Sequence, residues 1–269
     1  MNKKYRTFFG LTSEPFSSDL KLDEILETSE LKSVKKRFDY AVKLGGAGLV
    51  TGEIGSGKST SLRYAAERLH PSEYKTFYIT ATSGPVLELY RQIATEMGVY
   101  KISNSKAVML RIIKKEIEEL VNGKKLKVVL IIDEASLLRM EVIAELHTVT
   151  QFRKDSKPWL PVILCGQANL VDKMMYRSSA PFASRIVTRC HLEGLDRQGM
   201  EQYIDHHLTL AGVKTNIFED TAITAIQQGA GGILRKANHL ARGALIGASR
   251  EQSRTVTADH IRLAATEVF

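Results

Sequence analysis

The segment GEIGSGKS, residues 52–59, constrains the fold more than any other part of the sequence. It follows the short apolar run AGLV and precedes KSTSLRYAAERL, which has the apolar spacing of a helix. The glycines allow the backbone to curl so that successive N–H groups point toward one place, and the following helix adds the positive end of its dipole there. A glycine-rich loop between a strand and a helix, closed by Lys-Ser, is typical of sites that bind phosphate groups.

The polar residues of this loop predict bound ATP and Mg²⁺. Lys58 would place a cation beside the β- and γ-phosphates, and Ser59 would offer its hydroxyl to Mg²⁺. The remaining phosphate contacts would come from backbone N–H groups of the loop and of the first helical turn. The predicted nucleotide-binding residues are therefore Gly52, Glu53, Ile54, Gly55, Ser56, Gly57, Lys58, Ser59 and Thr60.

A second acidic element follows in KLKVVLIIDEA, residues 125–135. Its consecutive apolar residues indicate a parallel strand covered on both faces, and Asp133 and Glu134 stand at its end. At the same sheet edge as the loop, Asp133 is expected to hold the Mg²⁺ shell and Glu134 to orient and polarise the attacking water. The alternative is a pair of solvated carboxylates at a strand end. Together with the loop, the pair predicts ATP hydrolysis.

Three further polar residues are predicted to approach the nucleotide. Gln167, or in second place Asn169, follows the fourth strand and would sense the γ-phosphate; a generic polar loop is the alternative. Arg185, in preference to Arg189, would act on a neighbouring subunit's nucleotide as an arginine finger, unless it forms an ordinary surface ion pair. Arg235, after two glycines, would reach the γ-phosphate from a helical lid; the alternative is an ordinary arginine on a helix surface.

The order of apolar patterns predicts the architecture. AGLVTG, YKTFYITA, KLKVVLIID, LPVILCG and SRIVTRCHLE read as five strands alternating with helices, which indicates a central parallel five-stranded sheet in an α/β fold. After about residue 195 only helical spacing remains. The predicted domains are an N-terminal helical extension over 1–45, an ATPase domain over 46–194 and a small all-helical lid domain over 195–269.

The charge is distributed unevenly along the chain. Residues 1–190 contain 30 Lys and Arg against 21 Asp and Glu, whereas residues 191–269 contain 8 against 9. The excess of positive charge in the first part favours a polyanionic partner such as nucleic acid, with a solvated basic surface as the alternative.

The sequence offers no feature of a secreted or membrane protein. It has no run near the roughly 20 apolar residues of a spanning helix, and the N-terminus lacks the apolar stretch of a signal peptide. The two cysteines, Cys165 and Cys190, have no partners at metal-ligand spacing and are expected to be buried thiols. We therefore expect a cytoplasmic protein without a membrane partner.

Taken together, these elements resemble the AAA+ ATPases, and more narrowly the ExeA, TniB and MuB group. The resemblance covers nearly the whole chain. TGEIGSGKST and LIIDEAS correspond to the two Walker elements, which many ATPases share. More specific are four other segments: FFGLTSEPF, GQANL, SRIVTRCHLEGLDRQGMEQYIDHHLTLAG and GGILRKANHLARGAL. The chain departs from the group at His207, where members often have Arg, and at His147 and Gln151, where Arg and Asn are commoner.

The two branches of this group imply different functions. The secretion branch carries a membrane segment and a cell-wall-binding region after the ATPase, and we expect neither in a sequence that ends at Phe269 after the lid. The transposition branch is compact and basic, binds DNA when loaded with ATP, assembles as rings or filaments and regulates a transposase. Charge and length favour the transposition branch. The alternatives are a secretion-pathway ATPase and an ATP-gated loader in replication or repair.

The resemblance also indicates where double-stranded DNA would bind. In AAA+ proteins the loops that face a central channel follow the second strand and the helix after the acidic pair. Here these regions contain Lys101, Lys106, Arg153, Lys154 and Lys157. Such contacts would be made to phosphates by a homo-oligomer, with little sequence preference and a steep dependence on salt.

Overall fold

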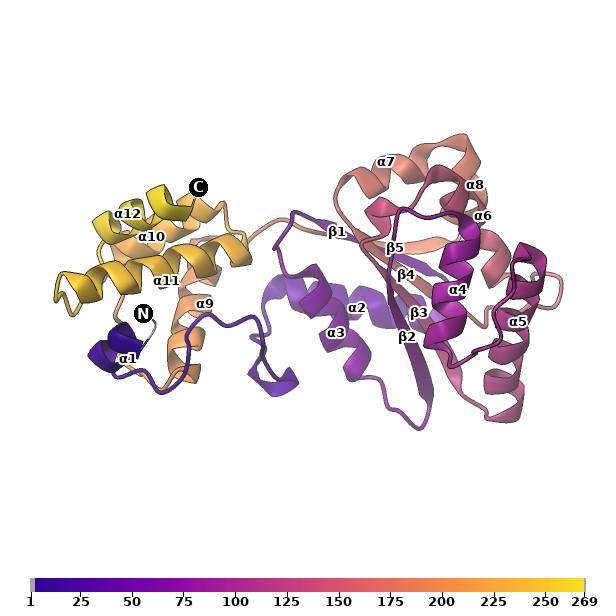
Figure 1. Ribbon diagram of the computed structural model, residues 1–269, viewed down its shortest axis with the longest axis horizontal. Helices are drawn as coiled ribbons and strands as arrows, with labels where there is room; N and C mark the ends of the chain where they lie inside the picture. The colour runs from indigo at the N-terminus through magenta and orange to yellow at the C-terminus, as the bar shows by residue number, and fades with distance from the viewer. Residues whose placement is uncertain (1–2, 269) are drawn as a thin grey trace. The chain divides into compact units, whose positions relative to one another are not determined.

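The apolar runs predicted as strands form one five-stranded parallel sheet in the computed structural model, which describes residues 3–268 (Figure 1). The strands are β1 (Ala47–Gly52), β2 (Tyr74–Thr80), β3 (Lys127–Asp133), β4 (Val162–Gly166) and β5 (Ile186–Leu192). They lie in the order β2-β3-β4-β1-β5, and every neighbouring pair is parallel. The predicted fold class, a five-stranded parallel sheet followed by a small all-helical region, is confirmed.

The chain divides into two compact units. The sheet unit consists of residues 29–52 and 58–192, and the helical unit consists of residues 3–28, 53–57 and 193–268. The sequence predicted one N-terminal extension over 1–45, whereas the structure divides this region between the two units. The reason is that its apolar residues are buried in two cores: Phe9 and Phe16 lie in the core of the helical unit, and Phe38 packs against the sheet.

Helices cover both faces of the sheet, as the consecutive apolar residues of its strands require. In β3, Leu130 and Ile132 face the helices α4, α5 and α6, whereas Val129 and Ile131 face α2 and α3. The helices of the sheet unit are α2 (Ser29–Leu44), α3 (Lys58–Glu67), α4 (Val86–Glu96), α5 (Lys106–Glu118), α6 (Met140–Thr150), α7 (Asn169–Met175) and α8 (Ala180–Ala183), with single turns at Glu119–Gly123, Ala135–Leu137 and Arg177–Ser179.

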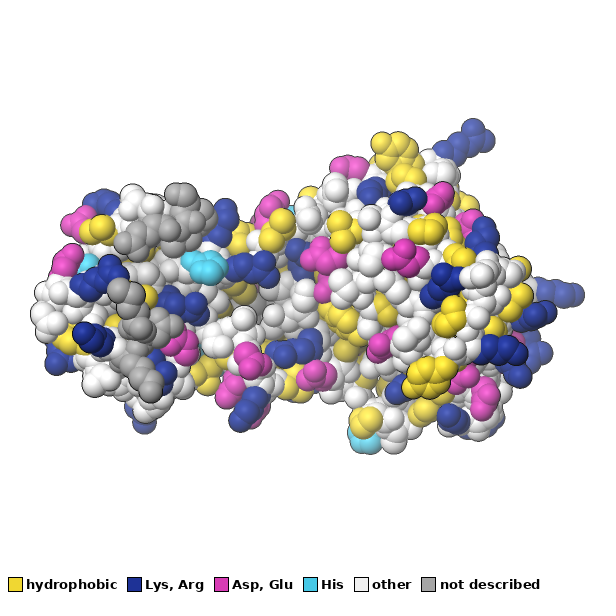
Figure 2. All heavy atoms as spheres, viewed as in Figure 1, with side chains coloured by type: hydrophobic (Ala, Val, Ile, Leu, Met, Phe, Trp, Pro, Cys, Tyr) yellow, Lys and Arg dark blue, Asp and Glu magenta, His cyan; other side chains and the backbone are white. Residues whose placement is uncertain are grey.

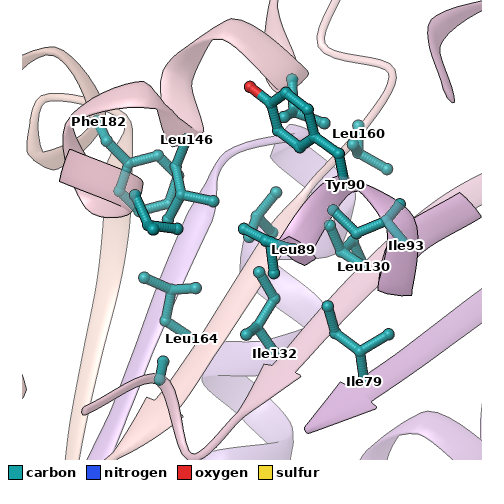
Figure 3. Close-up of a cluster of buried hydrophobic side chains, with 14 of the residues drawn as sticks. Ile79, Leu89, Tyr90, Ile93, Leu130, Ile132, Leu146, Leu160, Leu164 and Phe182 are labelled. Atoms are coloured by element: carbon teal, nitrogen blue, oxygen red, sulfur yellow. The ribbon is translucent and has the colours of Figure 1, made fainter. Parts of the chain in front are cut away.

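The core on the α4–α6 side fixes the position of β3 (Figure 3). Leu130 and Ile132 of β3 and Leu89 of α4 are each at most 3% exposed. Burying a side chain of this size stabilises the fold by about 1.5–3 kcal/mol. The hydroxyl of Tyr90 lies 3.0 Å from Oγ1 of Thr148, which satisfies the polar end of a buried ring. This packing holds the end of β3, where Asp133 stands.

The helical unit encloses its own core. It contains α1 (Lys3–Phe9), a turn at Leu22–Glu24, α9 (Arg197–Leu210), α10 (Asp220–Ala230), α11 (Leu234–Arg250) and α12 (Ala258–Val268). The segment FFGLTSEPF is anchored here, because the N–H of Thr12 donates to the carbonyl of Ala211 at 2.8 Å and the guanidinium of Arg242 donates to the carbonyl of Phe16 at 2.8 Å. None of the helices within residues 3–268 is long and apolar enough to cross a membrane.

His207 is a buried base in this core. It is 2% exposed, and its ring packs against Tyr203, with ring centres 4.5 Å apart, and against Phe16. Burial, and then the nearby His206 and Arg242, lower the pKa of His207 to about 4. Members of the resembled group commonly have arginine at this position, and burying its charge in these apolar surroundings would cost free energy. A neutral histidine avoids this cost.

Acid should destabilise the helical unit through His207. Because the folded pKa of His207 is about 4 and the unfolded value is about 6.5, the unfolded chain binds the extra proton between these values. Stability is therefore full above pH 6.5 and falls as the pH drops toward 4, by about 2 kcal/mol at pH 5. Urea unfolding at neutral pH and at pH 5 measures this loss. His207→Leu should reduce it, and His239→Leu, at an exposed position, should not; equal losses in all three proteins would contradict the assignment.

Candidate nucleotide site

The loop between β1 and α3 has the backbone geometry that the sequence predicted. Gly55 and Gly57 have φ angles of 85° and 95°, in the region that glycine occupies without strain. Lys58 opens α3 and is 7% exposed, and its Nζ donates to the carbonyl oxygen of Gly52 at 3.0 Å. The ammonium group is thus held over the start of the loop.

The loop also contacts the start of α11. The N–H of Arg235 donates to the carbonyl oxygen of Gly55 at 3.1 Å. A Cβ atom on Gly55 would lie 2.6 Å from Cβ of Arg235, and one on Gly57 would lie 3.1 Å from a methyl group of Leu234. Residue 55 therefore has to be glycine for this close approach as well as for the turn.

Asp133 and Glu134 lie at the end of β3, as predicted. Asp133 is 6% exposed, and its Oδ2 accepts a hydrogen bond from the hydroxyl of Tyr78 at 2.6 Å. Its Oδ1 accepts from the N–H of Glu134 at 2.8 Å. Glu134 itself has φ 52° and ψ 30°, a left-handed conformation that is uncommon outside glycine and is often found in functional residues.

The Asp133 carboxylate is kept ionised by its neighbours. Burial raises the pKa of Asp133, but hydrogen bonds from Ser59, Tyr78, the N–H of Glu134 and Cys165 outweigh burial and hold this pKa below its usual value. Burial, together with the negative charge of Asp133, raises the pKa of the Tyr78 hydroxyl and of the Cys165 thiol. Both groups therefore stay protonated and donate to the carboxylate. Sequence reasoning missed Tyr78 and Cys165, because only strand pairing brings them to Asp133.

Replacing Tyr78 by phenylalanine should raise the pKa of Asp133, because the carboxylate loses one donor. We expect ATP turnover at neutral pH to fall by less than about tenfold. The acid limb of the pH–rate profile should move to higher pH than in the wild type. Tyr40→Phe, on the exposed surface of α2, is the matched control. An unchanged acid limb in Tyr78→Phe would show that this hydrogen bond does not influence catalysis.

Ser59 and Asp133 fit the predicted magnesium site. The hydrogen bond between them brings a hydroxyl and a carboxylate oxygen together beside the loop. Mg²⁺ in nucleotide sites takes one or two protein oxygens and completes its octahedron with phosphates and waters. Among residues 3–268 no group of three or more His, Cys, Asp or Glu is arranged to hold a metal, so an all-protein cage is absent from this range. When held by Ser59 and Asp133, Mg²⁺ would offset part of the negative charge on the phosphates of ATP.

Gln167 directly follows β4, the strand between β3 and β1. The register pairs Thr51 of β1 with Gly166 and Ile132 of β3 with Leu164. Gln167 therefore extends from the sheet edge between the carboxyl ends of β1 and β3. Asn169, the second choice, is exposed at the start of α7.

The predicted arginines lie at different parts of the fold. Arg185 precedes β5 at the amino edge of the sheet, where its carbonyl accepts from the N–H of Ala47 at 2.8 Å. Its guanidinium forms an ion pair with Asp155 at 2.8 Å. Arg189 is exposed within β5. Arg235 contacts the phosphate loop through its backbone and is exposed.

The basic residues predicted to contact DNA lie around α5 and the turn after α6. Lys106 begins α5 and pairs with Glu145 of α6 at 2.6 Å. Arg153 lies 3.9 Å from Glu118 at the other end of α5, and its guanidinium lies 5.7 Å from the ring centre of Trp159. Lys101, Lys154 and Lys157 are exposed. Three further basic residues of α5, Arg111, Lys114 and Lys115, which the sequence did not single out, line a hollow of about 440 Å³.

Comparison with known proteins gives two kinds of match. Residues 42–174 match the family model described as AAA domain. The general secretion pathway protein A of Aeromonas hydrophila is 30% identical over 267 residues, which cover 98% of this chain and 48% of that protein. The chain thus spans about half the length of this relative. The relative is named for secretion, whereas the charge and length of the sequence favoured the transposition branch.

Solved structures show the same fold at low identity. Cdc6p from Pyrobaculum aerophilum is 14% identical with a TM-score of 0.73, covering 94% of this chain and 70% of Cdc6p. The Aeropyrum pernix ORC1 protein in complex with DNA is 14% identical with a TM-score of 0.67, covering 94% and 68%. These structures show that the chain has the AAA+ P-loop fold, and the AAA-domain match over residues 42–174, with the glycine-rich loop and the acidic pair in place, supports an ATP hydrolase.

Proposed function

We propose that this ATPase binds double-stranded DNA as an oligomer in its ATP state and regulates a partner transposase. The basic surface of the sheet unit is the observation that carries the proposal. Residues 106, 110, 114 and 118 form one stripe of α5, which abuts α6 through Lys106 and the turn after α6 through Glu118. The cations of α5, from Lys106 to Lys115, therefore extend over about 14 Å along the helix, and Arg153 continues the basic surface beside Glu118. Lys and Arg side chains gather at the α5 end of the sheet unit (Figure 2).

The ion pairs that these cations already form indicate which of them are available to contact DNA phosphates. Lys106 is already paired with Glu145, and Arg153 is near Glu118. In the described part of the chain, Lys154 and Lys157 form no ion pair and are exposed, so they are the first candidates for phosphate contacts. The A. pernix ORC1 protein, solved with DNA, shares this fold, which is consistent with DNA binding. The resemblance to TniB and MuB favours a transposase as the partner.

In this proposal, bound ATP would hold the oligomer together on DNA, and hydrolysis would limit how long it stays there. Bound ATP would be held by Lys58, by Ser59 with Mg²⁺, and by Gln167 and Arg235 as sensors of the γ-phosphate. Arg185 lies at the amino edge of the sheet, about 20 Å along β1 from the phosphate loop, so it would serve a neighbour's nucleotide. Subunits would stay together on DNA until water, activated by Glu134, hydrolyses the ATP.

Fluorescence anisotropy with labelled double-stranded DNA tests the proposal. Binding should be tight with ATP, weak with ADP or without nucleotide, and absent in Lys58→Ala. Lys154→Ala and Lys157→Ala should weaken binding to all sequences alike and lower the salt slope by about 0.9 per lost contact. Lys43→Ala is the matched control, because Lys43 is exposed on α2, which covers the opposite face of the sheet. Equal weak binding in all nucleotide states would contradict the proposal.

A secretion-pathway ATPase is the second candidate, and the Aeromonas hydrophila relative favours it. In that case the energy of ATP would act on envelope proteins, and DNA would neither bind in a nucleotide-dependent way nor stimulate turnover. The same anisotropy series therefore separates the two candidates.

A further inference from the structure

The turn between α6 and β4 has an unusual backbone. Three consecutive residues, Arg153, Lys154 and Asp155, have φ angles of 49°, 59° and 67°. Side chains other than glycine disfavour this left-handed region, and three such residues in a row are rare. The base of the turn is fixed by an antiparallel bridge between Phe152 and Lys157 and by the buried ring of Phe152. Its tip thus keeps a disfavoured conformation only while other contacts hold it.

Hydrogen bonds from Ser156 to the carbonyl oxygens of Phe152 and Arg153 hold the backbone of the turn, and Arg185 holds the side chain of Asp155. Its Nη2 donates to both carboxylate oxygens of Asp155, at 2.9 and 2.8 Å. Its Nε donates to Oγ1 of Thr150 at 3.1 Å, and its Nη1 donates to the carbonyl oxygen of Pro181 at 3.3 Å. All three guanidinium nitrogens are therefore engaged inside the same subunit. The Arg185 side chain is 23% exposed, whereas that of Asp155 is 52% exposed.

This arrangement conflicts with a role of Arg185 on a neighbour's ATP. The Asp155 carboxylate neutralises the guanidinium and would repel the triphosphate that the arginine has to approach. Asp155 must therefore move away before Arg185 acts. Its neighbours in the turn are Arg153, Lys154 and Lys157, the cations for which we propose DNA contacts. A phosphate backbone at this turn would attract these cations and repel Asp155.

We infer that Asp155 is a positioning residue, which withholds Arg185 from the neighbouring active site until a polyanion binds the turn of residues 153–157. The inference rests on the proposed function, because it takes Arg185 as the arginine finger and the turn as a DNA contact. It couples DNA binding to ATP hydrolysis through one short segment. The coupling is reciprocal, so release of Arg185 also strengthens DNA binding.

The test measures ATP turnover at saturating protein concentration, with and without double-stranded DNA. Asp155→Asn keeps the shape of the side chain and removes its charge. Without DNA, its rate of ATP turnover should rise about fivefold, which is the largest effect expected from removing one exposed ion pair. The factor by which DNA increases its rate should fall about fivefold as well. Asp172→Asn is the matched control, because Asp172 is an exposed acid on α7.

The double variant shows whether Asp155 acts through Arg185. In an Arg185→Ala background, Asp155→Asn should leave the residual rate unchanged, whereas a purely structural effect of Asp155 would persist. A DNA-free rate of Asp155→Asn equal to that of the wild type overturns the inference, whether or not DNA stimulates the wild type. A wild type that binds DNA without being stimulated by it also overturns the inference, whereas a wild type that does not bind DNA in its ATP state contradicts the proposed function. The two failures are thus distinguishable.

Discussion

Replacing Glu134 by glutamine should lower ATP turnover about 10²- to 10⁴-fold, because the amide cannot accept a proton from the attacking water. ATP binding should stay close to the wild-type value, since Lys58 and the loop are unchanged. The left-handed backbone of Glu134 and the hydrogen bond from its N–H to Asp133 at 2.8 Å remain available to glutamine. Phosphate release measured under saturating ATP gives the turnover, and a fluorescent ATP analogue gives the affinity.

Two comparisons sharpen this prediction. Glu141→Gln, at an exposed position of α6, should keep wild-type turnover. Asp133→Asn should impair turnover as well and should raise the Mg²⁺ concentration needed for half-maximal turnover, because Asp133 is expected at the metal. Turnover in Glu134→Gln within a factor of a few of the wild type would show that another group activates the water.

Replacing Lys58 by alanine should reduce ATP affinity about 10- to 100-fold, because the β- and γ-phosphates lose a charge-assisted hydrogen bond. Turnover should be lost with it. Lys58 is buried and donates to the carbonyl of Gly52 at 3.0 Å, so the variant also removes a contact within the loop. Circular dichroism therefore has to show an intact fold alongside the binding measurement.

Lys43→Ala, at an exposed site on α2, is the control for the loss of one lysine. Its ATP affinity should match that of the wild type. If Lys58→Ala also bound ATP with wild-type affinity, the loop of residues 52–59 would not be the triphosphate site.

Local patterns were sufficient to predict the sheet and the ends of its strands. Consecutive apolar residues identified β3, and parallel strands necessarily bring Gly52 and Asp133 to the same edge. The loop was predictable because the glycines that shape its backbone and the charge of Lys58 all lie within eight consecutive residues, so a local sequence pattern reveals them.

Long-range contacts were not predictable from these patterns. Tyr78 reaches Asp133 from a different strand, and Asp155 reaches Arg185 across 30 residues. Similarly, Phe16 enters the core of the helical unit, nearly 200 residues from Ile204 in the same core. No local spacing signals such pairs, because strand order and helix packing create them. Net charge favoured a polyanionic partner, but only the fold showed that the cations extend along α5.

The lifetime of the protein on DNA shows directly whether ATP hydrolysis ends DNA binding. Wild type and Glu134→Gln would each be loaded on labelled double-stranded DNA with ATP, and release would be followed after excess unlabelled DNA is added. If hydrolysis ends the clamped state, the wild type leaves as its ATP is consumed, and Glu134→Gln stays at least about 10² times longer. Release of both proteins at the same rate would contradict the account, because the ATP state would then not control DNA binding.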